Sequence, residues 1–383
     1  MRRRLATPGP TEVPQRLLLA GARETIHHRS ADMQRLMAQI NAELPALFAT
    51  EQDVYITTSS GTGAMEAAVV NCFSPGDEVL VVSNGYFGER FEALCGAFGV
   101  LAHPIRSPWG TSVDVDEVAA AWEAHPDVRG VLVVQSETSA GTLNDVEAVA
   151  ALFRDSDVLV VVDAISGLIS HRLLMDEWGL DVVLAASHKG FMLPPGLAFI
   201  ALSERAWPRV EQSRNPSFYW SFQRLRKFFP LSSTSPAVSL LLGLQEALVM
   251  IGEEGLEAIQ RRQALVADAT AQGLRRLGFE LVVEAPHRRG RVVTAAYTPE
   301  GIAPKDLLRT LSEDYAITMT GGQGVFAGKI VRLGHVGAVD ALELCSVFAG
   351  LELALSRMGH EFEAGAGVGA VVDVAAEHEV MSR

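Results

Sequence analysis

Short apolar runs alternate with amphipathic stretches from Asp53 onward. Continuous Val- and Leu-rich runs predict strands that are buried on both faces, whereas spacings of three and four residues predict helices. The predicted strands are Val54–Thr57, Glu78–Val82, Val100–Ile105, Val131–Val134, Val158–Val162 and Val182–Leu184. The predicted helices between most of them are Gly63–Phe73, Glu89–Phe98, Val115–Trp122 and Val146–Phe153. This order indicates an α/β protein with a mainly parallel sheet between two layers of helices.

The chain before this region begins with a proline-rich segment. Pro8, Pro10 and Pro14 lie within residues 1–20, which we interpret as an extended arm that rests on this subunit or on a neighbour. A helical stripe of apolar residues then covers Ser30–Phe48, with Ser30 as its predicted N-cap.

The pattern changes between Val210 and Ser235, where aromatic and basic residues are mixed. Two long helices follow, at Ala237–Ile251 and Glu254–Leu277, and lead into a smaller α+β domain. We therefore predict an arm (residues 1–20), a large domain (residues 21–252) and a small C-terminal domain (residues 253–383). The Gly/Ala/Val-rich tail after Glu363 is expected to fray.

Composition narrows the possible partners. The 383 residues carry a net charge of −14, which argues against nucleic acid or an anionic membrane as the main partner. The aromatic and basic segment Asn215–Phe229 is therefore expected at a subunit interface or at a substrate rim. The three cysteines show no CxxC spacing, which is typical of reduced core residues in a cytoplasmic protein. No signal peptide, membrane span or metal site is expected.

Chemistry-bearing residues follow four of the predicted strands, which is where open α/β sheets bind ligands. The stretch Thr57–Met65 places Ser60, Gly61 and Thr62 at the start of a helix, where a phosphate would meet free backbone N–H groups. Asn84–Arg90 offers an aromatic ring face, and Gln135–Gly141 offers several polar side chains. Taken alone, the first stretch is also compatible with a helix cap without a ligand, the second with core aromatics at a turn and the third with a polar turn.

Asp163 and Lys189 follow two further apolar strands. A buried carboxylate requires a partner, and the candidates are a following helix, a metal or the pyridinium nitrogen of a cofactor. A buried lysine has a lowered pKa, and a neutral amine is what Schiff-base chemistry requires. A phosphate site, a ring-facing aromatic residue, an aspartate and a lysine in this order together indicate pyridoxal phosphate (PLP).

These stretches make the chain resemble the class V (fold type I) PLP-dependent aminotransferases, in particular the alanine–glyoxylate and serine–glyoxylate aminotransferase group. The resemblance covers nearly the whole chain and rests on TPGPTEVPQRLL, SSGTGAMEAAVVN, VVSNGYFGERF, ETSAGTLN, VVDAISGL, DEWGLDVVLAASHKGFMLPPGLAFIALSERAW, TSPAVSLLLGLQEAL and KIVRLGHVG. It implies a large domain built on a mainly parallel, seven-stranded sheet and a homodimer with active sites at the subunit interface.

The resemblance also implies roles for single residues. Ser60, Gly61 and Thr62 would hold the PLP phosphate, Phe87 would stack on the ring, and Thr138 would bond near the phenolic oxygen. Asp163 would pair with the pyridine nitrogen, and Lys189 would bind the cofactor as a Schiff base. His188 stands where relatives commonly carry Gln. Thr234 would reach the phosphate of the neighbouring active site, although Leu231–Ser233 replaces the tyrosine expected beside it. Arg332 would bind the substrate carboxylate.

The resulting functional prediction is amino-group transfer from a small amino acid to a 2-oxo acid such as glyoxylate or pyruvate. Two alternatives stay open at this point. A β-lyase, desulfurase or decarboxylase on the same scaffold would share Asp163 and Lys189. A binding protein that has lost catalysis is also possible, although the intact Lys189 argues against it.

Overall fold

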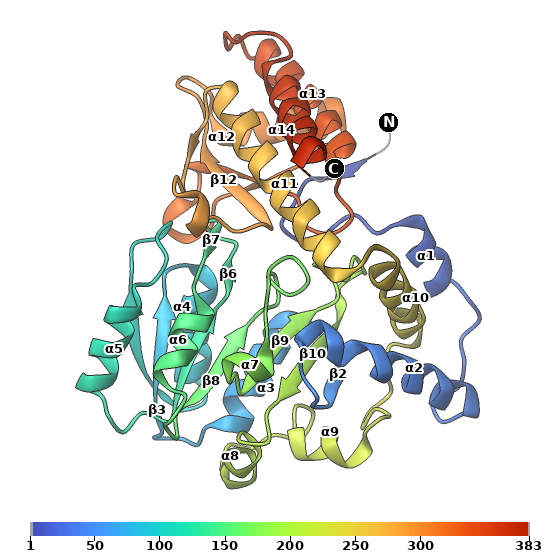
Figure 1. The fold of residues 1–383 in the computed structure, drawn as a ribbon, viewed down its shortest axis with the longest axis vertical. Helices are drawn as coiled ribbons and strands as arrows, with labels where there is room; N and C mark the ends of the chain where they lie inside the picture. Colours follow the sequence, from blue (N-terminus) through green and yellow to red (C-terminus); the bar gives the residue numbers. More distant parts are fainter. Residues whose placement is uncertain (1–2, 382–383) are drawn as a thin grey trace.

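The computed structural model describes residues 3–381 and contains a large domain and a small domain, one above the other in Figure 1. The large domain is built on a seven-stranded sheet in the order β2-β10-β9-β8-β5-β3-β4. β10 pairs antiparallel with both β2 and β9, and the other neighbouring strands pair in parallel. The predicted α/β class and mainly parallel sheet are thus confirmed. The strands are β2 (Val54–Ser59), β3 (Glu78–Ser83), β4 (Leu101–Arg106), β5 (Gly130–Val134), β8 (Leu159–Asp163), β9 (Val182–Ala186) and β10 (Gly196–Leu202).

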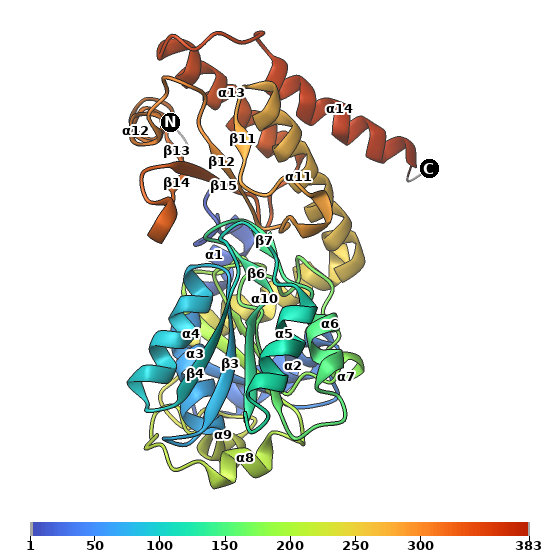
Figure 2. The same cartoon turned by 90° about the vertical axis from the view of Figure 1, so that its left-hand side faces the viewer.

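Helices cover both faces of this sheet (Figure 2), which explains why its central strands are apolar along their whole length. One hydrophobic core contains residues of α2 (Ala31–Phe48), α5 (Val115–Ala124), α6 (Val146–Leu152), α7 (Met175–Trp178) and α10 (Val238–Glu254). The other contains residues of α3 (Gly61–Cys72), α4 (Tyr86–Ala97), α8 (Trp207–Gln212) and α9 (Phe222–Phe228). As predicted, Ser30 caps α2, because its hydroxyl accepts the backbone N–H of Met33.

The small domain has an antiparallel four-stranded sheet in the order β11-β12-β15-β14. Its strands are β11 (Glu280–Leu281), β12 (Val293–Tyr297), β14 (Thr320–Gly321) and β15 (Ile330–Gly334). Its other elements are α11 (Leu256–Arg276), α12 (Pro304–Tyr315), α13 (Ala341–Arg357), β13 (Ile317–Thr318) and the short 3₁₀ turns η1 (Pro286–Arg288) and η2 (Gly324–Phe326). The hairpin of β6 (Ser136–Glu137) and β7 (Thr142–Leu143) reaches from the large domain toward this domain (Figure 1).

The prediction that the tail after Glu363 frays is wrong, because α14 (Ala366–Met381) packs against α11 and α13. The carboxylate of Glu352 on α13 accepts the backbone N–H groups of Gly365, Gly367 and Val368 at 2.7, 2.9 and 3.0 Å. These contacts satisfy backbone donors at the start of the helix. The stabilising residue lies outside the tail, so the composition of the tail could not reveal it.

The N-terminal segment links the two domains. β1 (Arg4–Leu5) pairs in parallel with β13 of the small domain, and α1 (Gln15–Gly21) packs on α10 of the large domain. Between them, Ala6 bonds through its backbone to Thr318 and Gly334 of the small domain, and Pro8 reaches Lys189 of the large domain. Within residues 3–381, no helix is long and apolar enough to cross a membrane.

Candidate active site

The candidate site lies at one edge of the large sheet, where β2, β3, β5, β8 and β9 have their carboxyl ends. The four polar stretches singled out in the sequence each follow one of these strands, and Lys189 follows the fifth. The topology therefore brings together stretches that are up to about 130 residues apart, as expected for ligand sites in open α/β sheets.

Asp163 and Lys189 are both buried and interact with each other. Asp163 is the last residue of β8 and is 4% exposed, and Lys189 lies three residues beyond β9 and is 7% exposed. Burial raises the pKa of Asp163 to about 7, against the opposing effect of the Ile165 N–H and the Lys189 charge. Burial lowers the pKa of Lys189 to about 8, and the charge of Asp163 offsets part of this effect. Lys189 is therefore an amine that can become neutral near physiological pH.

The N-terminal segment forms one wall around Lys189. The Lys189 Nζ donates a hydrogen bond of 2.8 Å to the carbonyl oxygen of Pro8. A Cβ atom at Gly9 would lie 2.5 Å from the same Nζ, so only glycine leaves room for the amine. Gly9 also has φ = +152°, which disfavours other residues. Sequence reasoning predicted an arm but gave it no contact with the lysine.

Ser60, Gly61 and Thr62 lie at the N-terminus of α3. Gly61 and Thr62 are the first two residues of this 12-residue helix, and Ser60 is its N-cap, with an exposed side chain that makes no capping hydrogen bond. Backbone N–H groups at this position have no acceptor within the helix, and the helix dipole attracts an anion. The Thr62 hydroxyl accepts a 2.8 Å hydrogen bond from Arg90 Nη1, which adds a positive charge beside the helix start.

Phe87 lies in the first turn of α4, and its ring carries the guanidinium of Arg90 on one face. Arg90 Cζ is 4.7 Å from the Phe87 ring centroid and 5.2 Å from that of Tyr86. Arg90 thus connects the proposed ring-stacking residue to the proposed phosphate site. Sequence reasoning gave Arg90 no role, although the arginine lies three residues after Phe87 and hence on the same face of the helix.

Glu137 is a second residue that sequence reasoning missed. Its side chain is fully buried, and burial raises its pKa. One carboxylate oxygen accepts the backbone N–H groups of Phe87 and Gly88 at 2.9 and 3.2 Å, and the other accepts the N–H and hydroxyl of Ser139 at 3.0 and 2.6 Å. A Cβ atom at Gly85 would lie 2.2 Å from Glu137 Cγ, so glycine permits this close approach. The sequence shows Glu137 as an acid shortly after an apolar strand, which hints at a buried role. Its partners Phe87 and Gly88 belong to a different strand–helix unit, so the sequence does not reveal the contact.

Arg332 brings the small domain to the site. It is the third residue of β15 and is 6% exposed. Its guanidinium donates to the carbonyl oxygens of Gly321 and Thr138 at 2.8 and 3.0 Å and to Gln323 Oε1 at 3.1 Å. These bonds engage Nε and Nη1 and fix the plane of the fork. The resemblance implies that Thr138 bonds near the phenolic oxygen of the cofactor. In the structure, the Thr138 carbonyl oxygen also accepts a hydrogen bond from Arg332.

Two predicted residues are less closely connected to this group. His188 precedes Lys189, and burial together with the Lys189 charge lowers its pKa to about 4. Among the described residues, the buried Nδ1 of His188 has no hydrogen-bond partner, so it is available to a ligand as a donor or an acceptor according to the tautomer. Thr234 lies between α9 and α10, where its N–H bonds to the Ser232 hydroxyl in the same loop. The described chain does not bring Thr234 to Lys189.

The chemistry of this group fits PLP. It provides a buried amine, a buried carboxylate with an oxygen that accepts no hydrogen bond from the described residues, and a helix N-terminus for a phosphate. The ring of Phe87 contacts Arg90, which bonds to Thr62 at that helix start, and a buried arginine comes from the other domain. An amine, a pyridinium partner and a phosphate site are the groups that this cofactor requires.

Comparison with known proteins connects this site to a family. The sequence model of the family "Aminotransferase class-V" matches residues 9–339. The chain is 37% identical to a protein of Synechococcus named soluble hydrogenase, small subunit, over 96% of each chain. It is 33% identical to L-aspartate–glyoxylate aminotransferase of Paracoccus denitrificans, over 95% of this chain and 93% of that one. The crystal structure of ureidoglycine–glyoxylate aminotransferase from Bacillus subtilis superposes with a TM-score of 0.94, 27% identity and 98% coverage of both chains.

Proposed function

The chain belongs to the class V aminotransferases, and on that premise we propose that Lys189, Asp163 and Arg332 form its active centre with PLP as the cofactor. One observation carries this proposal: a buried lysine and a buried aspartate interact at the strand ends, and a buried arginine of the other domain lies close enough to affect the pKa of the lysine. This arrangement provides separate groups for the cofactor and for a substrate carboxylate.

When bound, PLP supplies an electron-accepting ring that stabilises negative charge at the substrate Cα. Lys189 would hold the cofactor through its amine, and the same amine would accept a proton from the substrate Cα. Its lowered pKa of about 8 favours this role, because only a neutral amine accepts a proton. Asp163 holds the proton of the pyridine nitrogen by its charge. Burial disfavours an ionised Asp163, so a cationic partner stabilises its ionised form.

Arg332 orients the substrate by its carboxylate. A planar guanidinium binds a carboxylate through two parallel hydrogen bonds. Its contacts with Thr138, Gly321 and Gln323 fix the fork before the substrate arrives, which lowers the entropy cost of binding. We propose a small amino acid such as alanine or serine as donor and glyoxylate or pyruvate as acceptor. The names of the relatives support glyoxylate.

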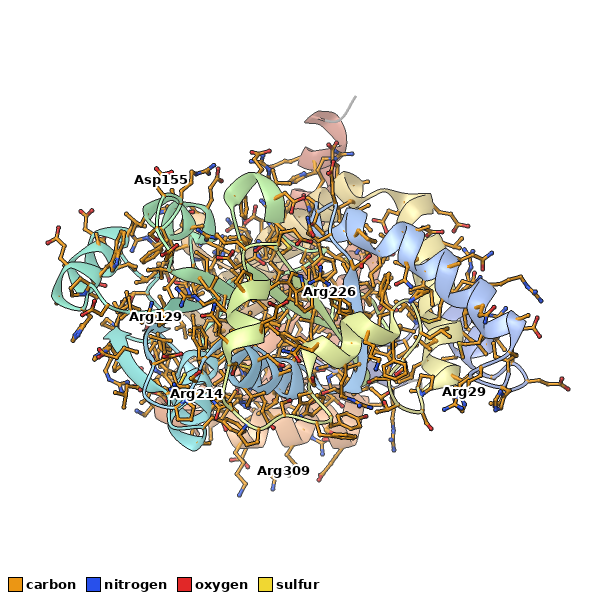
Figure 3. The ribbon with its side chains drawn as sticks, turned by 90° about the horizontal axis from the view of Figure 1, so that it is seen from below. Arg29, Arg129, Asp155, Arg214, Arg226 and Arg309 are labelled. Atoms are coloured by element: carbon orange, nitrogen blue, oxygen red, sulfur yellow. The ribbon has the colours of Figure 1, made fainter. Side chains whose placement is uncertain are left out.

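We further propose that the enzyme acts as a cytoplasmic homodimer in which Thr234 reaches the phosphate of the neighbouring site. The segment before Thr234 supports this, because Phe218, Tyr219 and Phe228 are 72%, 43% and 42% exposed. Exposed aromatic residues in one segment are typical of an interface. Figure 3 shows Arg226 of the same segment on the surface remote from the small domain, so this part of the large domain is open to a partner.

The experiment is to load the purified protein with PLP and screen amino donors by the loss of absorbance of the lysine-bound cofactor. Acceptors are then screened by the return of that absorbance. An aminotransferase shows both half-reactions with ping-pong kinetics, whereas a lyase or decarboxylase consumes the amino acid without the second half-reaction. Lys189→Ala should abolish the lysine-bound species. If reduction and peptide mapping find the cofactor on another lysine, the assignment is wrong. Lys305→Ala, at an exposed lysine in the first turn of α12, is the matched control.

The hydrogenase name of one relative finds no support in the cysteines of this chain. Metal clusters of redox enzymes are commonly held by cysteine thiolates. Cys72, Cys95 and Cys345 lie on α3, α4 and α13, so they come from both domains. Burial raises the pKa of Cys72 and Cys95, which favours neutral thiols over ligating thiolates.

A further inference from the structure

We propose that Glu78, His103 and His125 form a binding site for a zinc ion at the edge of the large sheet, remote from the active site. The carboxylate and the two imidazoles can each present one ligand atom, and these atoms lie within 4.8 Å of one another. Two histidines and one glutamate are a ligand set that zinc uses with an open fourth position for water. Imidazole and carboxylate donors together suit zinc better than calcium or magnesium.

The site is built by three separate elements. Glu78 is the first residue of β3, and His103 is the third residue of β4, which pairs with β3 in parallel. In this register Glu78 opposes Leu101, so Glu78 and His103 lie on the same face of the sheet, two positions apart. His125 is the C-cap of α5. These residues are far apart in the sequence, so no spacing motif could reveal them.

The contacts within the group are close. His103 Nε2 lies 2.6 Å from Glu78 Oε2, and the rings of His103 and His125 stack with their centroids 3.6 Å apart. The planes of the two rings differ by 19°, so the rings are stacked nearly parallel. One tetrahedral ion bound through both rings requires them to splay apart. His125 can turn, because its ring makes no hydrogen bond within the described residues 3–381 and follows the last residue of its helix.

The three residues lie at the opposite edge of the sheet from the proposed active site. Glu78 lies at the amino end of β3, whereas the site residues of the enzyme follow the carboxyl ends of the strands. Arg129, whose backbone N–H donates to the Glu78 carbonyl at 2.7 Å, lies on the surface seen from below in Figure 3. His103 and Glu78 are 28% and 39% exposed in their side chains, so an ion can reach them from solvent.

The structural consequence concerns β4, which lies at the edge of the sheet and pairs with β3. Edge strands are held by fewer contacts than central ones and are the first part of a sheet to open. An ion that joins β3, β4 and the end of α5 would fix this edge. We therefore assign the zinc site a stabilising role, and transamination is expected to continue without it.

The test uses the PLP-loaded protein freed of excess cofactor and titrated with zinc chloride by calorimetry. One equivalent of zinc should bind, and saturating zinc should raise Tm by about 3 °C or more. His103→Ala and His125→Ala should weaken binding by at least about 100-fold each, because each removes one of three ligands. Glu78→Gln keeps the shape of the side chain and should weaken binding without loss of folding. All three should keep the wild-type kcat.

His287→Ala is the matched control, because His287 is an exposed histidine of the small domain and should leave zinc affinity unchanged. Cobalt(II) in place of zinc provides a second readout, since a tetrahedral cobalt(II) ion absorbs visible light, and His125→Ala should abolish that absorption. The proposal is overturned if wild-type protein binds no zinc, or if binding persists in both histidine variants. Neither result affects the proposed aminotransferase function, which is measured separately.

Discussion

The carboxylate of Glu137 accepts the backbone N–H of Phe87 at 2.9 Å from a position that is fully buried. The same side chain accepts the N–H and hydroxyl of Ser139. Glu137 therefore fixes the start of α4, which carries Phe87 and Arg90, to the loop that carries Thr138. Thr138 in turn holds Arg332 of the small domain. One buried acid thus connects the proposed cofactor side of the site to its proposed substrate side.

Glu137→Gln should destabilise the protein and weaken PLP binding. The amide keeps one acceptor oxygen but places an NH₂ group beside two donors, so the hydrogen bonds that one oxygen of the charged carboxylate accepts are lost. Such bonds contribute roughly 1.5–3 kcal/mol each, so the loss of two predicts a decrease of roughly 3–6 kcal/mol in the free energy of unfolding. Urea unfolding measures it, and a PLP titration measures the cofactor affinity.

Glu89→Gln is the control for this substitution. Glu89 is an exposed acid in the same first turn of α4. Its loss should change stability by less than about 0.5 kcal/mol. Equal effects of the two substitutions would contradict the role assigned to Glu137.

Asp163 predicts how the stability of the cofactor-free protein depends on pH. Its pKa is raised by burial from 3.8 to about 7, so the folded state binds a proton that the unfolded state has released. The contribution of Asp163 protonation to the free energy of unfolding is fully present below about pH 4. It is lost as the pH rises toward about 7 and stays lost at higher pH. Asp163→Asn removes the titration and should stabilise the cofactor-free protein at about pH 8 by on the order of 2–4 kcal/mol.

Unfolding of both proteins at about pH 4.5 and about pH 8 measures this effect, because these values lie on either side of the transition. The two stability curves should converge at low pH and separate at high pH. With PLP added, the Asp163→Asn variant should be less active than the wild type, although it is the more stable protein without cofactor. Its amide carries no charge to hold the pyridinium proton. If Asp163→Asn is less stable than the wild type at about pH 8, the ionised carboxylate does not destabilise the cofactor-free protein, and the prediction is wrong.

The sequence revealed the elements of the sheet and the residues at its carboxyl edge, because both depend on local pattern. The Val-rich runs that became β5, β8 and β9 are apolar throughout, and each is followed by a polar stretch. The contacts that the sequence did not reveal are long-range. Glu137 meets Phe87, and Pro8 meets Lys189, across 50 and 181 residues. No periodicity encodes such a pair, and it follows only from the three-dimensional fold.

Substitution of Arg332 should weaken substrate binding selectively. Arg332→Lys keeps a positive charge but replaces the planar fork by a point charge that cannot bond to Thr138, Gly321 and Gln323 in the same way. Loss of one hydrogen bond to a charged group costs roughly 1.5–3 kcal/mol, so kcat/KM for amino acids should fall by roughly 10-fold or more. Binding of PLP itself should not change. The control is Arg309→Lys on α12, which is exposed and labelled in Figure 3.

The closeness of Gly9 to Lys189 predicts that the N-terminal segment is part of the active site. A methyl group at this position would approach Lys189 Nζ to 2.5 Å, and its φ of +152° would strain alanine. Gly9→Ala should therefore displace the segment or the lysine and lower kcat by about 10-fold or more, because misplacement of a reacting group by about 1 Å costs up to about 100-fold. The rate at which Lys189 captures PLP, followed by absorbance, should fall with it. Gly96→Ala is the control, since Gly96 lies in helix α4 with no atom within 4 Å of an added Cβ. Wild-type kinetics in Gly9→Ala would show that the segment does not touch the working lysine.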